Sequence, residues 1–266
     1  MSTTNIPLNK VENIPVKNTT SRSPTIVFIH GNSTSSDVWK KQFENEDLAL
    51  FHLVAFDLLG HGKSARLDDY SIKNQVQILV ENCHQFENIL LVGHSLGAHL
   101  TIELLPFINN CIGCLIFGAP PVKKPINLEE AFLPNEKMDY FFEEKLNEIQ
   151  VDEIVKLLIG DNSELVETLR DNIKNTDPKY RSSIAKEIGI GGFSDEYEIL
   201  RASKIPIGIF QGENDPLVST KYLQALEITG LWRNKIIAIP NSGHSPQLEN
   251  PTFFNKAFLE FVNEIS

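Results

Sequence analysis

The sequence has few cysteines, little positive charge and no long apolar run. Its 266 residues include three cysteines and 24 Lys and Arg against 35 Asp and Glu, which gives a formal net charge of −11. Without a basic patch, we expect neither nucleic acid nor an anionic membrane as a partner. No stretch reaches the ~20 apolar residues of a membrane-spanning helix, and residues 1–17 lack the apolar segment of a secretory signal. We therefore expect a cytoplasmic protein.

So few cysteines agree with a reducing compartment. Cys111 and Cys114 have the C-x-x-C spacing of some redox and metal sites. However, residues 112–117 form an apolar run typical of a buried strand, and positions three apart on a strand point to opposite faces. We interpret both cysteines as small core residues, and we expect neither a metal nor a cofactor.

Short apolar runs alternate with segments that are compatible with helices. This alternation predicts a doubly wound, mostly parallel sheet with helices on both faces. Because little sequence precedes Ser23, any leading antiparallel hairpin must be short. The expected strands are residues 25–29, 52–56, 89–92, 112–117, 205–210 and 236–239.

The pattern changes between Pro120 and Gly192, where the sequence is charged, helix-compatible and without a convincing strand. We expect residues 1–119 and 193–266 to form the core domain and residues 120–192 to form an inserted helical cap subdomain. The cap ends in Gly191 and Gly192, which we interpret as a hinge. Its expected helices are residues 128–132, 139–159, 163–174 and 181–188. Near the C-terminus, residues 252–265 carry an aromatic stripe at helical spacing, which indicates core packing.

A serine stands in the pentapeptide GHSLG, residues 93–97, directly after an expected strand and before the helix-compatible stretch 98–105. This is the strand–turn–helix context that a G-x-S-x-G nucleophile elbow requires. In so tight a turn, side chains beside the serine would collide with backbone, and the serine itself must adopt a strained conformation. We expect this turn to lift the hydroxyl of Ser95 clear of the sheet edge as a nucleophile.

A serine nucleophile needs a histidine base, and the base needs an acid that fixes its tautomer. For the order serine, acid, histidine, only His244 of the seven histidines lies beyond the candidate acid. That acid is Asp215, in the turn after residues 205–210, whereas Glu213 is expected in solvent. The turn after residues 112–117 offers no carboxylate. The expected catalytic residues are therefore Ser95, Asp215 and His244.

A developing oxyanion needs two backbone N–H donors. Leu96, the residue after the serine, should supply one, and Asn32, in the loop after residues 25–29, should supply the other. We expect the side chain of Asn32 to be free to contact a polar group of the substrate. Gly31 precedes it in the same loop and is expected to contact the substrate too.

With these motifs in place, the sequence resembles the α/β-hydrolase superfamily over nearly its whole length. A narrower likeness, to the α/β-hydrolase-type N-acyl homoserine lactone lactonases, lies in residues 30–35, 118–122, 176–177 and 231–232, among others. The resemblance implies metal-free opening of a lactone ring. It also implies Asn32 in the lactone contact region and Ser95, Asp215 and His244 as the triad. The acid is an aspartate where that group can have a glutamate, and residues 123–171 match the group poorly. Within this segment, Tyr140 is the candidate that we expect to contact the substrate.

The sequence thus predicts a serine hydrolase of the α/β-hydrolase fold that cleaves a small-molecule carboxylic ester or lactone. An N-acyl homoserine lactone is the favoured substrate, and a general short-chain carboxylesterase is the alternative. A non-catalytic small-ligand receptor on the same fold is an alternative of another class. We expect a monomer or a weak homodimer.

Overall fold

A seven-stranded sheet forms the centre of the structure, a computed structural model that describes residues 6–15, 23–160 and 164–266. The strand order is β1-β3-β2-β4-β5-β6-β7. The pair β1–β3 is antiparallel and all other neighbours are parallel, which confirms the mostly parallel sheet and its short antiparallel edge. The strands are β1 (Lys10–Asn13), β2 (Thr25–Ile29), β3 (His52–Phe56), β4 (Ile89–His94), β5 (Cys111–Phe117), β6 (Ile207–Gly212) and β7 (Ile237–Ile239).

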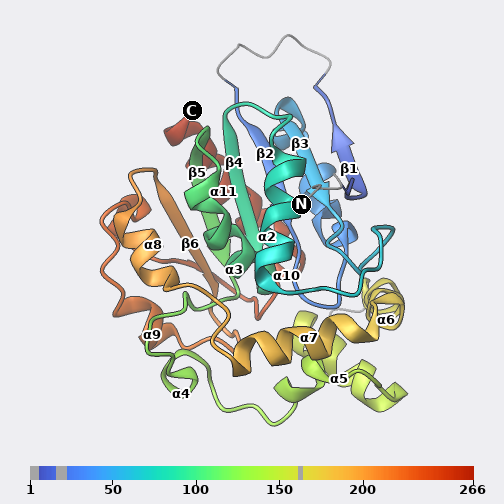
Figure 1. The fold of residues 1–266 in the computed structure, drawn as a ribbon. Helices are drawn as coiled ribbons and strands as arrows, with labels where there is room; N and C mark the ends of the chain where they lie inside the picture. The colour runs from blue at the N-terminus through green and yellow to red at the C-terminus, as the bar shows by residue number, and fades with distance from the viewer. Residues whose placement is uncertain (1–5, 16–22, 161–163) are drawn as a thin grey trace.

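Helices cover both faces of this sheet, with α2 in front of it and α11 behind it in Figure 1. Within the described ranges, no helix is both long and apolar enough to cross a membrane. The α-helices are α1 (Lys40–Phe43), α2 (Ile72–Cys83), α3 (Leu96–Leu104), α4 (Leu128–Ala131), α5 (Glu148–Ile159), α6 (Val166–Asn175), α7 (Pro178–Gly189), α8 (Glu196–Ala202), α9 (Thr220–Gln224), α10 (Pro246–Glu249) and α11 (Pro251–Ile265). Short 3-10 helices are η1 (Ser36–Trp39), η2 (Leu48–Leu50), η3 (Leu105–Phe107), η4 (Met138–Phe142) and η5 (Trp232–Asn234).

The core has one apolar cluster on each face of the sheet. Phe28 of β2 belongs to the cluster that packs against α11, and its neighbour Val27 belongs to the cluster that packs against α2. Cys114 and Cys111 divide between the same two clusters, as expected for strand positions three apart, and both are buried free thiols. In α11 the predicted aromatic stripe is buried at positions 254, 258 and 261, whereas Phe253 is 40% exposed.

The parallel register brings the carboxyl ends of six strands, β2 to β7, to one edge. Ile29 at the end of β2 lies opposite Gly93 of β4, and Phe117 at the end of β5 lies opposite Phe210 of β6. Gly212 in turn lies opposite Ile239 of β7. Since the loops leave the strands at this edge, the residues that follow each strand meet there.

Residues 120–192 contribute α4, η4, α5, α6 and α7, which Figure 1 shows gathered at one end of the sheet. In the described part of this segment, strand pairing is limited to an isolated antiparallel bridge from Phe132 to Val218. The predicted helix 163–174 corresponds to α6, but its first residue, Ser163, lies outside the described residues. The segment packs into the same apolar cluster as the sheet, through residues such as Ile154. Its division from the core as a separate subdomain stays a prediction.

The predicted single helix 139–159 is wrong, because η4 ends at Phe142 and α5 begins only at Glu148. Asn147 caps α5 by accepting the N–H of Gln150, and the side chain of Gln150 accepts the N–H of Asn147 in return. Such a capping box starts a new helix and so favours a break before it. Arg181 of α7 stabilises the break by donating to the backbone carbonyls of residues 143 and 144, at 2.7 and 3.0 Å.

Candidate active site

Ser95 forms the sharp turn between β4 and α3. Its backbone has φ 53° and ψ −125°, a conformation that residues other than glycine rarely adopt. Its N–H donates to the carbonyl of Phe117 on the neighbouring strand at 2.9 Å. A side chain at Gly97 would collide with the carbonyl oxygen of Ile29, and one at Gly93 would collide with that of Gly97. The turn therefore needs both glycines and holds Ser95 in one strained orientation.

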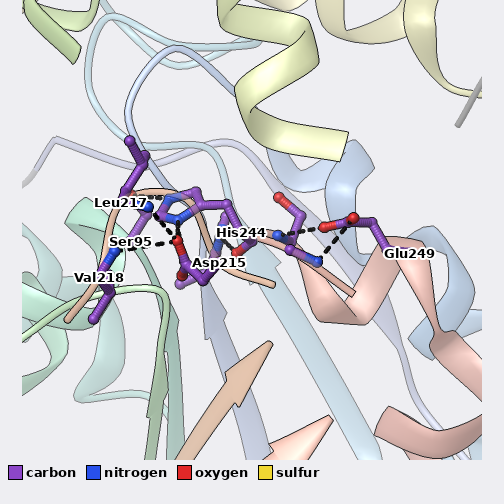
Figure 2. Close-up of polar contacts among 9 residues, drawn as sticks. Ser95, Asp215, Leu217, Val218, His244 and Glu249 are labelled. Carbon is purple, nitrogen blue, oxygen red and sulfur yellow. Dashed lines mark hydrogen bonds and ion pairs between the residues drawn. The ribbon is translucent and has the colours of Figure 1, made fainter. Parts of the chain in front are cut away.

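The three predicted catalytic side chains lie in a single hydrogen-bonded row (Figure 2). The Oγ atom of Ser95 is 3.1 Å from Nε2 of His244, and Nδ1 of His244 is 3.2 Å from each carboxylate oxygen of Asp215. His244 lies in the loop after β7, and Asp215 lies in the turn after β6. Ser95 thus meets two residues that lie 120 and 149 positions further along the sequence, as predicted from their motifs.

Asp215 is held ionised although it is buried. Its Oδ1 accepts the N–H groups of Leu217 and Val218, at 2.9 and 3.2 Å (Figure 2). Burial alone would raise the pKa of this carboxyl, but the charge of His244 and these hydrogen bonds lower the pKa below its usual value. An ionised Asp215 accepts the Nδ1 proton of His244, which leaves Nε2 free to accept a proton from Ser95.

Glu249 of α10 holds the backbone on both sides of His244, a role that the sequence did not reveal. Its Oε2 accepts the N–H of Gly243 and its Oε1 accepts the N–H of Ser245, both at 2.9 Å (Figure 2). Burial raises the pKa of Glu249, and the two N–H donors and the charge of His244 only partly oppose this rise. The carboxylate therefore fixes the position of the peptide that carries His244.

His94, the residue before the serine, contacts the backbone of His244. Its Nε2 lies 2.9 Å from the carbonyl oxygen of His244, and its ring stacks on Phe117. Burial, followed by the charge of His244, lowers the pKa of His94 to about 3. The ring is therefore neutral and donates its Nε2 proton to that carbonyl. This role too had no signal in the sequence beyond adjacency to Ser95.

The loop after β2 approaches the serine closely. A Cβ atom at Gly31 would lie 3.0 Å from Cβ of Ser95, so a larger residue would press on the nucleophile. Leu96 is the first residue of α3, and its N–H is therefore one of the four that a helix leaves without an intrahelical acceptor. Asn32 and Leu96 both line the cavity beside Ser95.

The expectation that the Asn32 side chain is free is wrong. Its Nδ2 donates to the carbonyl of Phe141 in η4 at 2.7 Å, and its Oδ1 accepts the hydroxyl of Ser33 at 3.1 Å. The amide therefore ties the loop after β2 to the segment 120–192. A contact between residues so far apart in the chain could not be anticipated from the loop sequence alone.

A cavity of about 500 Å³ opens over Ser95 and His244. Most of its wall is apolar and comes from residues 120–193, including Ile126, Phe132 and Ile184. Tyr140 is not among the lining residues, although residues 138, 139, 141 and 142 are; its side chain packs against the main core cluster. Such a mostly apolar cavity with a few polar groups at one end is typical of a small-molecule site.

Comparisons with known proteins agree with this arrangement. The family model described as "Alpha/beta hydrolase family" matches residues 26–257. "Putative esterase/lipase 2" of Mycoplasma pneumoniae is 25% identical over 254 residues, which cover 90% of this chain and 89% of the relative. A thermophilic esterase from Thermogutta terrifontis has the same fold, with a TM-score of 0.77 at 19% identity and coverage of 98% of this chain and 94% of the esterase.

The N-acyl homoserine lactonase AidH is similar over the full length. The structure of its serine-to-glycine mutant, complexed with N-hexanoyl homoserine lactone, gives a TM-score of 0.91 at 25% identity and covers 100% of this chain and 97% of that one. AidH is the kind of protein that the sequence resembles, and the family model covers most of the chain. This chain therefore belongs to the alpha/beta hydrolase family.

Proposed function

We propose that this chain is a serine hydrolase that opens N-acyl homoserine lactones, with Ser95, His244 and Asp215 as its catalytic triad. The observation that carries the proposal is the row of hydrogen bonds from Asp215 through His244 to the hydroxyl of Ser95, at the end of a mostly apolar cavity. This row has the contacts that nucleophilic acyl transfer requires: nucleophile to base, and base to orienting acid.

In the proposed reaction, Nε2 of His244 accepts the hydroxyl proton while Oγ of Ser95 attacks the lactone carbonyl. The N–H groups of Leu96 and Asn32 donate to the oxyanion that forms. Asp215 stabilises the imidazolium, which then gives its proton to the ring oxygen as the carbon–oxygen bond breaks. A water molecule, deprotonated by His244, next attacks the acyl-enzyme. Its hydrolysis releases the ring-opened acid and restores Ser95.

The lactone substrate is supported by the likeness to AidH and by the shape of the site. AidH has been captured with N-hexanoyl homoserine lactone in its serine-to-glycine mutant and with the ring-opened N-butanoyl homoserine. In this chain, apolar side chains such as Ile126, Phe132 and Ile184 provide a wall against which an acyl chain can pack. We propose that residues 120–192 act as the cap that selects substrates by the length of their acyl chain.

A second candidate is a short-chain carboxylesterase, favoured by the similarity to the esterase/lipase of Mycoplasma pneumoniae. The two candidates share the triad and differ in the alcohol that the carbonyl carbon releases. An ester releases a separate alcohol, whereas the alcohol of a lactone stays attached to the acyl group. The two candidates are separated by offering the purified protein both p-nitrophenyl butanoate and N-hexanoyl homoserine lactone. Proton release reports ring opening. Fast ester turnover without ring opening would favour the carboxylesterase.

Replacing the nucleophile tests the mechanism itself. Ser95→Ala should lower kcat on the order of 10⁴-fold or more, because without Oγ the base and the acid have no group to activate. Ser182→Ala, on the outer surface of α7, is the matched control and should keep wild-type turnover. Near-normal hydrolysis by Ser95→Ala would refute the proposed triad.

A further inference from the structure

A second histidine, His99, faces the same cavity as Ser95. His99 lies on α3 four residues after Ser95, and its backbone N–H donates to the carbonyl of Ser95 at 3.4 Å. Ser95 is the N-cap of α3 and its backbone is not helical, so the shared cavity, and not a shared helix face, relates the two side chains. Both side chains line the cavity. An imidazole therefore shares a cavity wall with the proposed nucleophile.

His99 is paired with a buried carboxylate. Its Nδ1 lies 2.8 and 3.1 Å from the two oxygens of Glu196 on α8. Glu196 is fully buried, and its Oε2 also accepts the N–H of Val122 at 2.7 Å. A buried carboxylate is stable only when it is paired and hydrogen-bonded. Here His99 is the group that supplies the opposite charge.

The protonation of His99 follows from these neighbours. Burial would lower the pKa of His99, but the charge and hydrogen bond of Glu196, together with the charge of Glu103, raise the pKa above its ordinary value. Glu103 lies one turn further along α3 and accepts the N–H and the hydroxyl of Ser194, at 2.6 and 2.8 Å. With Nδ1–H given to Glu196, a protonated ring presents a second donor, Nε2–H.

That second donor has no partner among the described residues, which provide hydrogen bonds to Nδ1 alone. The side chains that line the cavity near His99 are apolar, including Phe193, whose ring centroid is 5.4 Å from that of His99, and Ile188. A charged N–H group facing an apolar cavity is satisfied by an acceptor that enters the cavity. The bound molecule should therefore bring that acceptor.

We propose that His99 determines substrate specificity by donating its Nε2 proton to a second carbonyl oxygen of the substrate, a few bonds from the carbonyl that Ser95 attacks. The amide carbonyl of an N-acyl amino lactone is an oxygen of this kind, whereas a simple alkyl ester or an alkyl lactone has none. This assignment rests on the proposed function, because it assumes that Ser95 attacks a substrate in this cavity.

The test compares two lactones that differ in this oxygen. N-hexanoyl homoserine lactone carries the amide, and α-heptyl-γ-butyrolactone replaces its N–H and C=O groups by two methylene groups. For the wild type, kcat/KM should favour the amide lactone. In His99→Gln the new side chain can still donate to Glu196 but has no charged second donor. The ratio of the two kcat/KM values should then fall roughly tenfold to a hundredfold. An equal loss on both lactones, with an unchanged ratio, would mean that His99 has only a structural role.

A pH series keeps the proposal testable even if His99→Gln fails to fold. In the wild type, the ratio of kcat/KM for the amide lactone to kcat/KM for the alkyl lactone should be highest below the raised pKa of His99. It should fall as the pH rises through this pKa, because the ring then loses a proton. A ratio that stays flat from about pH 6 to about pH 9 would overturn the proposal. Where His99→Gln folds, its own profile gives the baseline for the other titratable groups. These are Glu103 and Glu196, whose charges act on His99, and Asp139, Glu143 and His244, which line the cavity.

Failure of the proposed function gives a different result. If the wild type hydrolyses neither lactone, or if Ser95→Ala hydrolyses both normally, the catalytic assignment is wrong. Calorimetric titration with the same two lactones then tests His99 by itself. Tighter binding of the amide lactone that is lost in His99→Gln supports the role of His99, and equal binding of both lactones refutes it.

Discussion

Glu249 offers a direct test of how much the reaction depends on the backbone around His244. The change is Glu249→Gln, which keeps the size of the side chain and one acceptor oxygen. The second oxygen becomes an NH2 group, which faces the N–H of either Gly243 or Ser245. In the wild type, each of these N–H groups lies 2.9 Å from a carboxylate oxygen that accepts it. One of two anchors on the His244 peptide is therefore lost, and one backbone donor is left without its partner.

Two magnitudes follow from this geometry. A hydrogen bond to a charged acceptor contributes about 1.5–3 kcal/mol, but the raised pKa of Glu249 shows that folding disfavours its ionised form, which offsets part of the loss. The free energy of unfolding should therefore fall by less than about 2 kcal/mol. Catalysis should suffer more, because a shift of ~1 Å in a catalytic group can lower the rate about a hundredfold. We expect kcat to fall roughly tenfold to a hundredfold with little change in KM.

Steady-state kinetics and urea denaturation of the same preparation measure both effects. Glu260→Gln is the matched control, since Glu260 lies on the exposed side of α11 and pairs with Arg233. It should leave kcat unchanged. If Glu249→Gln has a kcat within about twofold of wild type, Glu249 is not a positioning residue. If the loss of kcat is matched by a collapse in stability, the carboxylate serves the fold and not the reaction.

Two further predictions concern the fold around the site. Asp57→Asn should lower the free energy of unfolding by about 1.5–3 kcal/mol, because the carboxylate accepts three hydrogen bonds. Burial opposes ionisation, but the charge of His30 and the hydrogen bonds from Ser36 and Lys63 lower the pKa of Asp57. The difference in free energy of unfolding between wild type and Asp57→Asn, measured by urea denaturation, should therefore shrink as the pH falls through this lowered pKa. Gly97→Ala should cost about 1–3 kcal/mol or more, through collision with backbone at Ile29, whereas Gly189→Ala, with open space around it, should change the thermal midpoint little.

Six of the seven strands are predictable because each is a short apolar run that ends at a polar turn, whereas β1, with the sequence KVEN, has no such run and was not predicted. The runs 25–29 and 52–56 agree with β2 and β3 residue for residue. The run 205–210 was placed two residues early, since Pro206 has no N–H to donate and the strand begins only after it, at Ile207. The break before α5 had a visible signal in the capping box of Asn147 and Gln150, which the periodicity of residues 139–159 concealed.

Some residues of the candidate site can be predicted from the sequence and others cannot. Ser95, Asp215 and His244 each lie in the turn or loop that follows a parallel strand, so that the sheet brings them to the same edge. Glu249 and Glu196 have no such context, because each reads as an ordinary polar residue of a helix. What gives them a role is a contact that depends on how loops fold over the sheet, such as the pair of His99 and Glu196, 97 positions apart. One sequence contains no pattern that identifies such a pair.

Three histidines around one serine show how neighbouring groups set the chemistry of a side chain. His94 has a buried ring with no carboxylate bonded to it, and its lowered pKa makes it a neutral donor to the backbone of His244. His99 has Glu196 against Nδ1, which raises the pKa of His99 and so favours the protonated ring at the cavity. His244 lies between Asp215 and Ser95, where a base is needed. Neither Asp215 nor Glu196 lines the cavity. In the proposed mechanism each carboxylate acts on the substrate through a histidine, so exchanging either carboxylate for its amide should change the protonation of that histidine before it changes the shape of the site.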